Sequence, residues 1–377
     1  MIQIAKPHLT EEEAQRAYET VLTGWVTQGP KVQEFEENFS AYVGAQYAVA
    51  VSNCTTALHL AMIVSGIGPG DEVICPSLSF IATANAITYV GAKPVFAEVD
   101  PETYNLDVHD VEQRITTQTK AILLVHQMGM PADIESFTAL CAQYDLQLIE
   151  DAACAAGSAY KGQKIGSHSD LVCFSFHPRK VITTGDGGMI TTSNPTYAER
   201  LKLLRHHGMS VNDRDRHLSK SIIFEDYIEI GYNYRMTDIQ AAIGIPQLAR
   251  LNWLVTERRK IAFHYIEALH DIEWLRFPLE PQGSFSNYQS FCIYLRPECP
   301  CERNTLMQKL LEAGIATRRG IMTAHRELAY KNHCHGLTLP ITEDVSDRSI
   351  LLPLYVPMSA TDIEYVISTF RNILGRL

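Results

Sequence analysis

The residue with the greatest chemical potential in this sequence is Lys180, which lies between two apolar segments and beside a glycine-rich turn. The segments Leu171–Phe176 and Met189–Thr192 are each predicted to form a short buried strand, and Gly185–Gly188 leads into the second. A lysine in such a connection is expected at the floor of a cleft, where loss of water lowers its pKa and frees the amine to attack a carbonyl group. On these residues alone, an ordinary loop lysine is the better interpretation.

A second stretch offers a carboxylate. Glu150 and Asp151 end a predicted strand that begins near Leu146, and small residues follow them. In a parallel sheet the carboxyl ends of the strands lie at the edge where ligands bind, so one of these carboxylates is expected there. A solvated strand end is the competing interpretation of the same pair.

A third stretch, Asn53–Thr56, connects a predicted strand, Tyr47–Ser52, to a predicted helix. A strand that turns into a helix through small hydroxyl residues leaves free N–H groups and the positive end of the helix dipole facing outward, which suits a phosphate dianion. Ser and Thr are also ordinary helix caps, so this stretch by itself is weak support for a phosphate site.

The composition excludes several classes of protein. Lys and Arg total 32 against 43 Asp and Glu, and this balance argues against a general nucleic-acid-binding or anionic-membrane surface. Nine cysteines without a disulfide-like spacing favour a reducing compartment, and no signal peptide or membrane span is evident, so we expect a cytoplasmic protein. Cys299 and Cys301 lack the further ligands of a metal site, so no metal is expected.

Strands and helices alternate through the first two thirds of the chain, which predicts an α/β fold with a mostly parallel sheet covered on both faces. From about residue 251 the pattern changes to helices and strands typical of a smaller α+β layer. We therefore expect a large domain over residues 1–250 and a small domain over residues 251–377. The main predicted elements are strands at 71–76, 94–99, 121–126 and 289–295 and helices at 32–43, 133–144, 254–269, 303–313 and 360–374.

Ser175, Lys180 and the run Thr184–Gly188 together resemble the cofactor-lysine motif of the nucleotide-sugar aminotransferases of the DegT/StrS type. That family has the fold type I architecture of enzymes that use pyridoxal 5′-phosphate (PLP). The resemblance covers nearly the whole chain, and four motifs occur in the right order: Cys54–Thr55, Asp151, Ser175 with Lys180, and Asn233. Four ordered matches outweigh the interpretation of Lys180 as an ordinary loop lysine.

The resemblance implies a role for each matched residue. Lys180 would carry the cofactor and move the reacting proton, and Asp151 would pair with the pyridine nitrogen and keep the ring electron-withdrawing. Asn233 would reach the cofactor phosphate of the neighbouring subunit, which implies a homodimer with shared active sites. The implied cofactor-binding set is Cys54, Thr55, Phe80 (stacked on the ring), Asp151, Ser175, Lys180 and Asn233.

The sequence departs from the family pattern at three positions. Cys54 stands where Gly is usual, Cys154 where Gln or His usually lies beside the ring, and Asp186 where Glu is usual. A basic cluster has two interpretations: a solvated face, or the lip over a nucleotide diphosphate that the resemblance implies. Its members are Arg318, Arg319, His325 and Arg326.

The resemblance implies an aminotransferase of amino-sugar biosynthesis that moves an amino group from an amino acid, glutamate, to a keto sugar, most often a nucleotide-linked keto-deoxysugar. A sugar dehydratase of the same fold is an alternative, but such relatives carry His in place of Lys180. A non-catalytic binding or regulatory protein is the second alternative, and the intact Lys180 and Asp151 argue against it. The shape of the pocket selects the acceptor, and the motifs do not reveal that shape, so a ketocyclitol acceptor is also compatible with the sequence.

Overall fold

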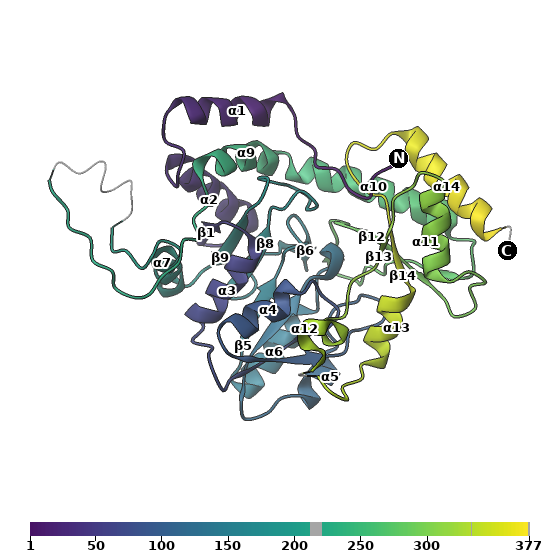
Figure 1. The fold of residues 1–377 in the computed structure, drawn as a ribbon, viewed down its shortest axis with the longest axis horizontal. Helices are drawn as coiled ribbons and strands as arrows, with labels where there is room; N and C mark the ends of the chain where they lie inside the picture. Colours follow the sequence, from purple (N-terminus) through teal and green to yellow (C-terminus); the bar gives the residue numbers. More distant parts are fainter. Residues whose placement is uncertain (212–220, 333, 376–377) are drawn as a thin grey trace.

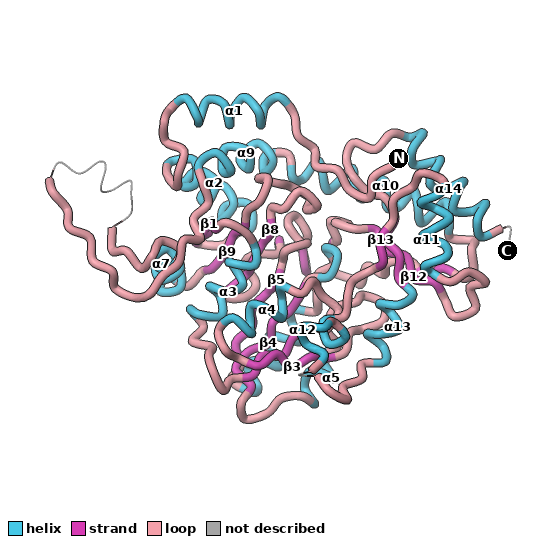
Figure 2. The backbone as a smooth tube through the Cα atoms, viewed as in Figure 1, coloured by secondary structure: helices cyan, strands magenta, loops and turns pink. Residues whose placement is uncertain are grey.

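A seven-stranded sheet with the order β1-β9-β8-β5-β4-β2-β3 forms the centre of the computed structural model, which describes residues 1–211, 221–332 and 334–375 (Figures 1 and 2). The strands from β8 to β3 run parallel, whereas β9 is antiparallel to both β8 and β1. The predicted α/β class with a mostly parallel sheet is confirmed. The strands are β1 (Tyr47–Val51), β2 (Glu72–Pro76), β3 (Lys93–Ala97), β4 (Thr119–Val125), β5 (Gln147–Asp151), β8 (Leu171–Ser175) and β9 (Gly188–Thr192).

Helices cover both faces of this sheet because successive strand residues point to opposite sides. In β1, Ala48 and Ala50 pack into the core beneath α2, whereas Val49 and Val51 join the core beneath α3. Each strand is therefore apolar on both faces, as a doubly covered sheet requires. One face carries α2 (Pro30–Val43), α5 (Val108–Gln113), α6 (Ile134–Tyr144) and α9 (Asp238–Ala249), and the other carries α3 (Cys54–Val64), α4 (Ala82–Tyr89) and α7 (Pro195–Leu204).

The C-terminal part forms a separate four-stranded antiparallel sheet, in the order β10 (Leu275–Arg276), β12 (Phe291–Leu295), β14 (Ser349–Leu352) and β13 (Arg318–Arg319). It packs against α10 (Leu251–Leu269), α11 (Arg303–Glu312) and α14 (Ala360–Leu374) (Figure 1). The first residues of the chain join this part, since Ile2 pairs with Ile315 and the Leu354 N–H donates to the carbonyl of Ile4 (3.2 Å). The hydrophobic core continues from α2 through α10 into α14 without a break. A domain boundary at residue 250 stays a prediction.

The predicted closing helix matches α14 (Ala360–Leu374) at both ends. Pro246 lies within α9, which continues for three residues and ends at the cap Arg250, where α10 (Leu251–Leu269) begins. A third small sheet, β11-β6-β7, has no signal in the sequence because its strands are two residues long. The other elements are α1 (Glu11–Leu22), η1 (Gln127–Gly129), β6 (Ala159–Tyr160), β7 (Gln163–Lys164), β10 (Leu275–Arg276), β11 (Ser284–Phe285), β12 (Phe291–Leu295), α11 (Arg303–Glu312), β13 (Arg318–Arg319), η2 (Ala324–Arg326), α12 (Leu328–Lys331), α13 (Pro340–Arg348) and β14 (Ser349–Leu352).

All nine cysteines lie in the described part of the chain, and each is a free thiol. None of the helices in the described ranges combines the length and the apolar composition that crossing a bilayer requires.

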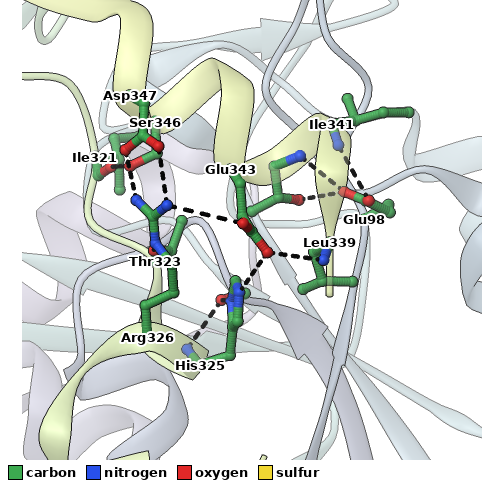
Figure 3. A network of polar contacts seen from close by, with 12 residues as sticks. Glu98, Ile321, Thr323, His325, Arg326, Leu339, Ile341, Glu343, Ser346 and Asp347 are labelled. Carbon is green, nitrogen blue, oxygen red and sulfur yellow. Dashed lines mark hydrogen bonds and ion pairs between the residues drawn. The ribbon is translucent and has the colours of Figure 1, made fainter. Parts of the chain in front are cut away.

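A buried carboxylate joins the two parts of the chain (Figure 3). Glu98, one residue beyond β3, accepts hydrogen bonds from the backbone N–H groups of Ile341 (3.2 Å) and Thr342 (2.8 Å) and from the Thr342 hydroxyl (2.6 Å). These donors lie in the first turn of α13, so the carboxylate also faces the positive end of the helix dipole. Glu98 thus anchors α13 to the edge of the central sheet.

Replacing Glu98 with Ala should lower the free energy of unfolding by about 1–3 kcal/mol, because three donors lose their acceptor and two of them belong to buried Thr342. Urea denaturation followed by far-UV circular dichroism measures the change. Glu102→Ala is the matched control, since Glu102 is exposed nearby. Equal midpoints for the two variants would contradict the anchoring role of Glu98.

Candidate active site

The loop between β8 and β9 places Lys180 at the edge of the central sheet. Its two ends are joined by hydrogen bonds from Phe176 N–H to the Gly187 carbonyl (2.9 Å) and from Thr184 N–H to the Phe176 carbonyl (3.0 Å). Lys180 is half-buried, and its Nζ donates to the sulfur of Cys154, three residues after the end of β5 (3.1 Å). The structure therefore brings the predicted lysine to the carboxyl end of the strand that carries the predicted acid.

Asp151, the last residue of β5, is buried, and each of its carboxylate oxygens accepts one hydrogen bond. The Ala153 N–H donates to Oδ1 (3.0 Å) and the Thr83 hydroxyl donates to Oδ2 (2.8 Å). Burial raises the pKa of Asp151 above its usual value, although these two hydrogen bonds and the charge of Lys180 oppose the rise. Because a carboxylate oxygen accepts two hydrogen bonds, both oxygens keep capacity for a ligand.

Glu150, the other acid of the pair, points to the opposite face of the sheet, where His126 Nε2 contacts its Oε2 (2.7 Å). Both side chains are fully buried, and the Ala132 N–H donates to His126 Nδ1 (3.1 Å), so Nε2 carries the proton that bonds Glu150. Burial by itself would raise the pKa of Glu150, but the hydrogen bond from His126 outweighs it and the pKa is lowered. Glu150 belongs to the core, and Asp151 alone of the two faces Lys180.

The sequence-based expectation that burial lowers the pKa of Lys180 is wrong for this structure. Burial does act in that direction, but the neighbouring sulfur of Cys154 and the carboxylate of Asp151 act against it, and the pKa is raised. The sequence could not show this, because Cys154 and Asp151 lie more than 25 residues from Lys180.

The start of α3 has the geometry of an anion site. Asn53 caps the helix by accepting from the Thr56 N–H (2.9 Å), which leaves the N–H groups of Cys54 and Thr55 without an intrahelical acceptor. The Cys54 side chain is buried in the core beneath α3, so the replacement of the usual Gly does not place a side chain over these N–H groups. Ser175 adds a hydroxyl from the neighbouring part of the sheet.

Gly188 allows this close assembly. It pairs with Ser175 on β8 and with Val51 on β1, so it lies between Ser175 and the strand that leads into α3. A Cβ atom at Gly188 would lie 2.5 Å from the carbonyl carbon and oxygen of Asn53 and 2.8 Å from the nitrogen of Cys54. Gly188, the third glycine of the predicted motif, is therefore required by the close approach of β9 to the start of α3, and not by Lys180.

Phe80 lies in the loop after β2 and is 67% exposed, so its ring is open to a ligand. Its carbonyl accepts from the Thr83 N–H (3.1 Å), which ties the loop to Asp151 through the Thr83 hydroxyl. Ser79 lies 2.7 Å from that hydroxyl, and since Thr83 donates to Asp151, Ser79 donates to Thr83. Thr83 has no role in the motifs that the sequence offers, although a hydroxyl one turn after Phe80 is a usable signal.

Asn233, which the resemblance assigns to the cofactor phosphate, is not directed at the start of α3 in its own chain. It is exposed and pairs with His206, whereas the rings of Tyr232 and Tyr234 stack (4.9 Å between centroids) and pack on His59 of α3. In an extended segment neighbouring side chains point to opposite sides, so Asn233 points away from α3.

The predicted basic cluster is largely paired with acids (Figure 3). His325 is buried and contacts Glu343 (3.1 Å), and Arg326 forms two hydrogen bonds with Asp347 (2.9 and 2.5 Å). These two residues are held by contacts within the fold, and the lip over a nucleotide diphosphate stays a prediction. Arg318 and Arg319 are exposed on β13.

The site fits the chemical groups of PLP on three separate observations. A lysine amine lies beside a buried carboxylate with capacity for a pyridine N–H, and a helix start with two N–H groups that lack an intrahelical acceptor lies next to Ser175. In the described ranges, no group of three or more His, Cys, Asp or Glu side chains is placed to hold a metal ion.

Comparisons with known proteins agree with this assignment. Residues 7–371 match the DegT/DnrJ/EryC1/StrS aminotransferase family. The chain is similar to the aminotransferase TlmJ from Streptoalloteichus hindustanus (34% identity, TM-score 0.92, covering 100% of this chain and 99% of that one). It is also similar to a putative sugar aminotransferase from Streptococcus pneumoniae in its PLP form (30%, 0.92, 100% and 99%). A third match is the Helicobacter pylori aminotransferase PseC of pseudoaminic acid biosynthesis (26%, 0.93, 100% and 100%).

Replacing Gly188 with Ala should destabilise the protein by about 1–3 kcal/mol, because a Cβ there overlaps the backbone of Asn53 and Cys54, which cannot move aside as a side chain can. Thermal unfolding measures the loss. Gly68→Ala is the control, since a Cβ at Gly68 meets no atom within 4 Å. Wild-type stability of Gly188→Ala would show that β9 and the start of α3 are not in close contact.

Proposed function

The chain belongs to the DegT/DnrJ/EryC1/StrS aminotransferase family, and on that premise we propose that it uses PLP to transfer the amino group of glutamate to the keto group of a nucleotide-linked keto-deoxysugar. The observation that carries the proposal is the placement of Lys180 and Asp151 in one site at the edge of the central sheet, beside the start of α3. The dehydratase alternative is disfavoured because position 180 is a lysine, and the binding-protein alternative because both reactive groups are in place.

Each part of the cofactor has a partner in this site. Lys180 would hold its aldehyde carbon and Asp151 its pyridine nitrogen, while the N–H groups of Cys54 and Thr55 and the hydroxyl of Ser175 would hold its phosphate. Phe80 would lie against the ring. When bound, the cofactor supplies an electron sink for negative charge at the donor's α-carbon.

The residues of the chain then have defined tasks. Lys180 Nζ, once free, takes the proton from the α-carbon of the donor and returns it on the cofactor side, as a general base and then a general acid. Asp151 would pair as a carboxylate with the pyridine nitrogen and keep it protonated, and Thr83 fixes the orientation of that carboxylate (2.8 Å).

Two arginines support an anionic substrate. Arg179 directly precedes Lys180, and burial together with the nearby charge of Arg318 lowers the pKa of Arg179. Two neighbouring guanidinium groups, one of them on the loop of Lys180, suit the carboxylates of glutamate or the diphosphate of a nucleotide sugar. The acceptor class itself is supported by the sugar aminotransferases among the matched structures.

The purified protein should be yellow, and glutamate should bleach it. Borohydride reduction followed by peptide mass spectrometry should place the cofactor on Lys180. Lys180→Ala should lose transamination by at least about 100-fold, because the general base is removed. Lys164→Ala is the control, since Lys164 is half-buried but donates to the Gly157 carbonyl (3.0 Å) instead. Cofactor attached to Lys164 or Lys161 would refute the assignment.

We propose that the active unit is a homodimer with two shared sites. The described residues 221–230 extend away from the fold in Figure 1 and expose large apolar side chains, as a segment that packs on a partner does. Asn233 itself points away from its own α3, which is consistent with a contact to the cofactor phosphate of the partner subunit. The exposed side chains are Ile222 (85%), Phe224 (87%), Tyr227 (63%), Ile228 (67%) and Ile230 (89%).

Mixing Lys180→Ala and Asn233→Asp chains, each inactive alone, should restore activity. In a C₂ heterodimer one site receives the intact Lys180 of one chain and the intact Asn233 of the other, so random exchange yields about one quarter of the sites intact. Activity is measured after subunit exchange, which native mass spectrometry verifies. Exchange without any recovery, or full activity of a monomer, would rule out the shared site.

A further inference from the structure

Lys180 is held at both ends, at its main chain and at its amine. The Lys180 N–H donates to the His177 carbonyl (2.8 Å). The carbonyl of Arg179, which belongs to the same peptide group as that N–H, accepts from Gln289 Nε2 of the C-terminal part (2.8 Å). At the other end, Lys180 Nζ donates to the sulfur of Cys154 (3.1 Å). The base and the tip of this side chain are therefore fixed separately.

Both contacts lead back to the side chain of Asn287, which is fully buried. Its Nδ2 donates to the carbonyls of Cys154 (2.8 Å) and Ala156 (2.8 Å), so it holds the turn after β5. Its Oδ1 accepts from the Gln289 N–H (2.8 Å), so the same amide also orients the residue that holds the backbone beside Lys180. Two paths of hydrogen bonds thus join Asn287 to the reactive lysine.

The amide of Asn287 has a single usable orientation. The reverse orientation would set its oxygen against two carbonyl oxygens, where no hydrogen bond can form. A Cβ atom at Gly129, in the loop after β4, would lie 1.8 Å from Asn287 Oδ1 and 3.1 Å from the carbonyl oxygen of Cys154. The surroundings of Asn287 are therefore closely packed as well as hydrogen-bonded.

The segment that carries Asn287 and Gln289 is anchored on two sides. Arg258 of α10 is buried, and its guanidinium donates to the Gln289 carbonyl just before β12 begins (2.6 Å). The Asn287 N–H donates to the Ser158 hydroxyl (3.1 Å), which itself donates to the Gly129 carbonyl (2.6 Å). The C-terminal part and the loops after β4 and β5 therefore fix these two amides together.

We propose that Gln289 and Asn287 are positioning residues, through which the C-terminal part of the chain places the amine of Lys180 for proton transfer at the donor's α-carbon. The inference rests on the proposed aminotransferase function, in which Lys180 takes and returns that proton. Neither amide acts as an acid, a base or a nucleophile. Gln289 fixes the point of the main chain from which the lysine extends, and Asn287 fixes the turn against which its amine rests.

The placement of Lys180 matters because the rate of the reaction depends steeply on geometry. An error of about 1 Å in the position of a reacting group can cost on the order of 100-fold in rate. A lysine amine stands at the end of a flexible four-carbon stem, so a small shift of the main chain changes where the amine reaches. Loss of the bond from Gln289 should therefore slow the proton transfer and leave the affinity for the donor unchanged.

The variant Gln289→Met tests the proposal, because methionine is about as long as glutamine but cannot donate to the Arg179 carbonyl. Rapid mixing of the PLP-loaded chain with glutamate follows the bleaching of the yellow form in one half-reaction. The rate at saturating glutamate should fall by about 10-fold or more, with the half-saturating concentration within about twofold of wild type. Deuterium at the α-carbon of glutamate should slow the variant at least as much as the wild type, because proton transfer then limits the rate. Gln282→Met, which changes an exposed glutamine, is the matched control and should behave like the wild type.

A second measurement needs no cofactor. Hydrogen exchange of the cofactor-free chain, read by peptide mass spectrometry, should be faster in Gln289→Met for the peptide that contains Lys180 and unchanged in β4. Asn287→Ser should also speed exchange in residues 153–158, because a serine hydroxyl is too short to reach both carbonyls of that turn. Gln289 is only half-buried, so Gln289→Met decides the proposal even where Asn287→Ser does not fold.

Three results would overturn the proposal. The first is a wild-type rate of bleaching in Gln289→Met. The second is a slower rate whose isotope effect has fallen toward one, because another step would then limit the reaction. The third is faster hydrogen exchange throughout the chain, which would show that Gln289 stabilises the fold in general and does not position Lys180.

Failure of the proposed function is distinguishable from failure of this inference. A wild-type chain that glutamate does not bleach, or that carries PLP on another lysine, would refute the function and with it the step that Gln289 is proposed to serve. Normal bleaching of both the wild type and Gln289→Met would refute the role of Gln289 and leave the function in place.

Discussion

The placement of a lysine amine inside the fold, next to a buried carboxylate and a thiol, is the constraint that orders the rest of this structure. A half-buried ammonium is stabilised by nearby acceptors, and the Cys154 sulfur (3.1 Å) together with Asp151 supplies that environment. The carboxylate in turn is held by Thr83 and Ala153, so its orientation does not depend on a ligand. The neighbours that hold the amine also raise its pKa and so favour the ammonium, and the reactivity of the amine therefore depends on where its proton goes.

The carboxyl ends of β1, β5 and β8 bring these groups together at one edge of the sheet. The start of α3 follows β1, Asp151 ends β5, and Ser175 ends β8, while β9 runs antiparallel and begins there with Gly188. The absence of a side chain at Gly188 lets β9 approach the backbone of Asn53. A single short strand therefore links the anion site to the loop of the reactive lysine, and the two cannot shift independently.

The loop that carries Phe80 is held by the C-terminal part of the chain. The Ser77 hydroxyl contacts His325 Nδ1 (2.6 Å) and the Ala324 N–H donates to the Ser77 carbonyl (2.8 Å). His325 also contacts Glu343 of α13, whose first turn is anchored on Glu98 (Figure 3). His325, which the sequence suggested as part of a basic surface, therefore joins the two parts of the fold, whereas Arg326 pairs with Asp347 within the C-terminal part.

The sequence by itself determined the sheet class, most element positions and the family, because hydrophobic period, caps and short motifs are local properties that survive without tertiary contacts. It singled out Lys180 and Asp151 because their neighbours in the chain form the motifs. The sequence could not decide whether the pKa of Lys180 is raised or lowered. It also could not show that Glu150 pairs with His126 while Asp151 faces Lys180, or that Thr83 holds the Asp151 carboxylate. Those depend on groups 20 to 100 residues apart, and only the packing of β5 between β4 and β8 sets which of them meet. Electrostatic effects fall off over a few ångströms, so the pKa shifts depend on distances between side chains. The fold creates those distances, and the sequence does not contain them.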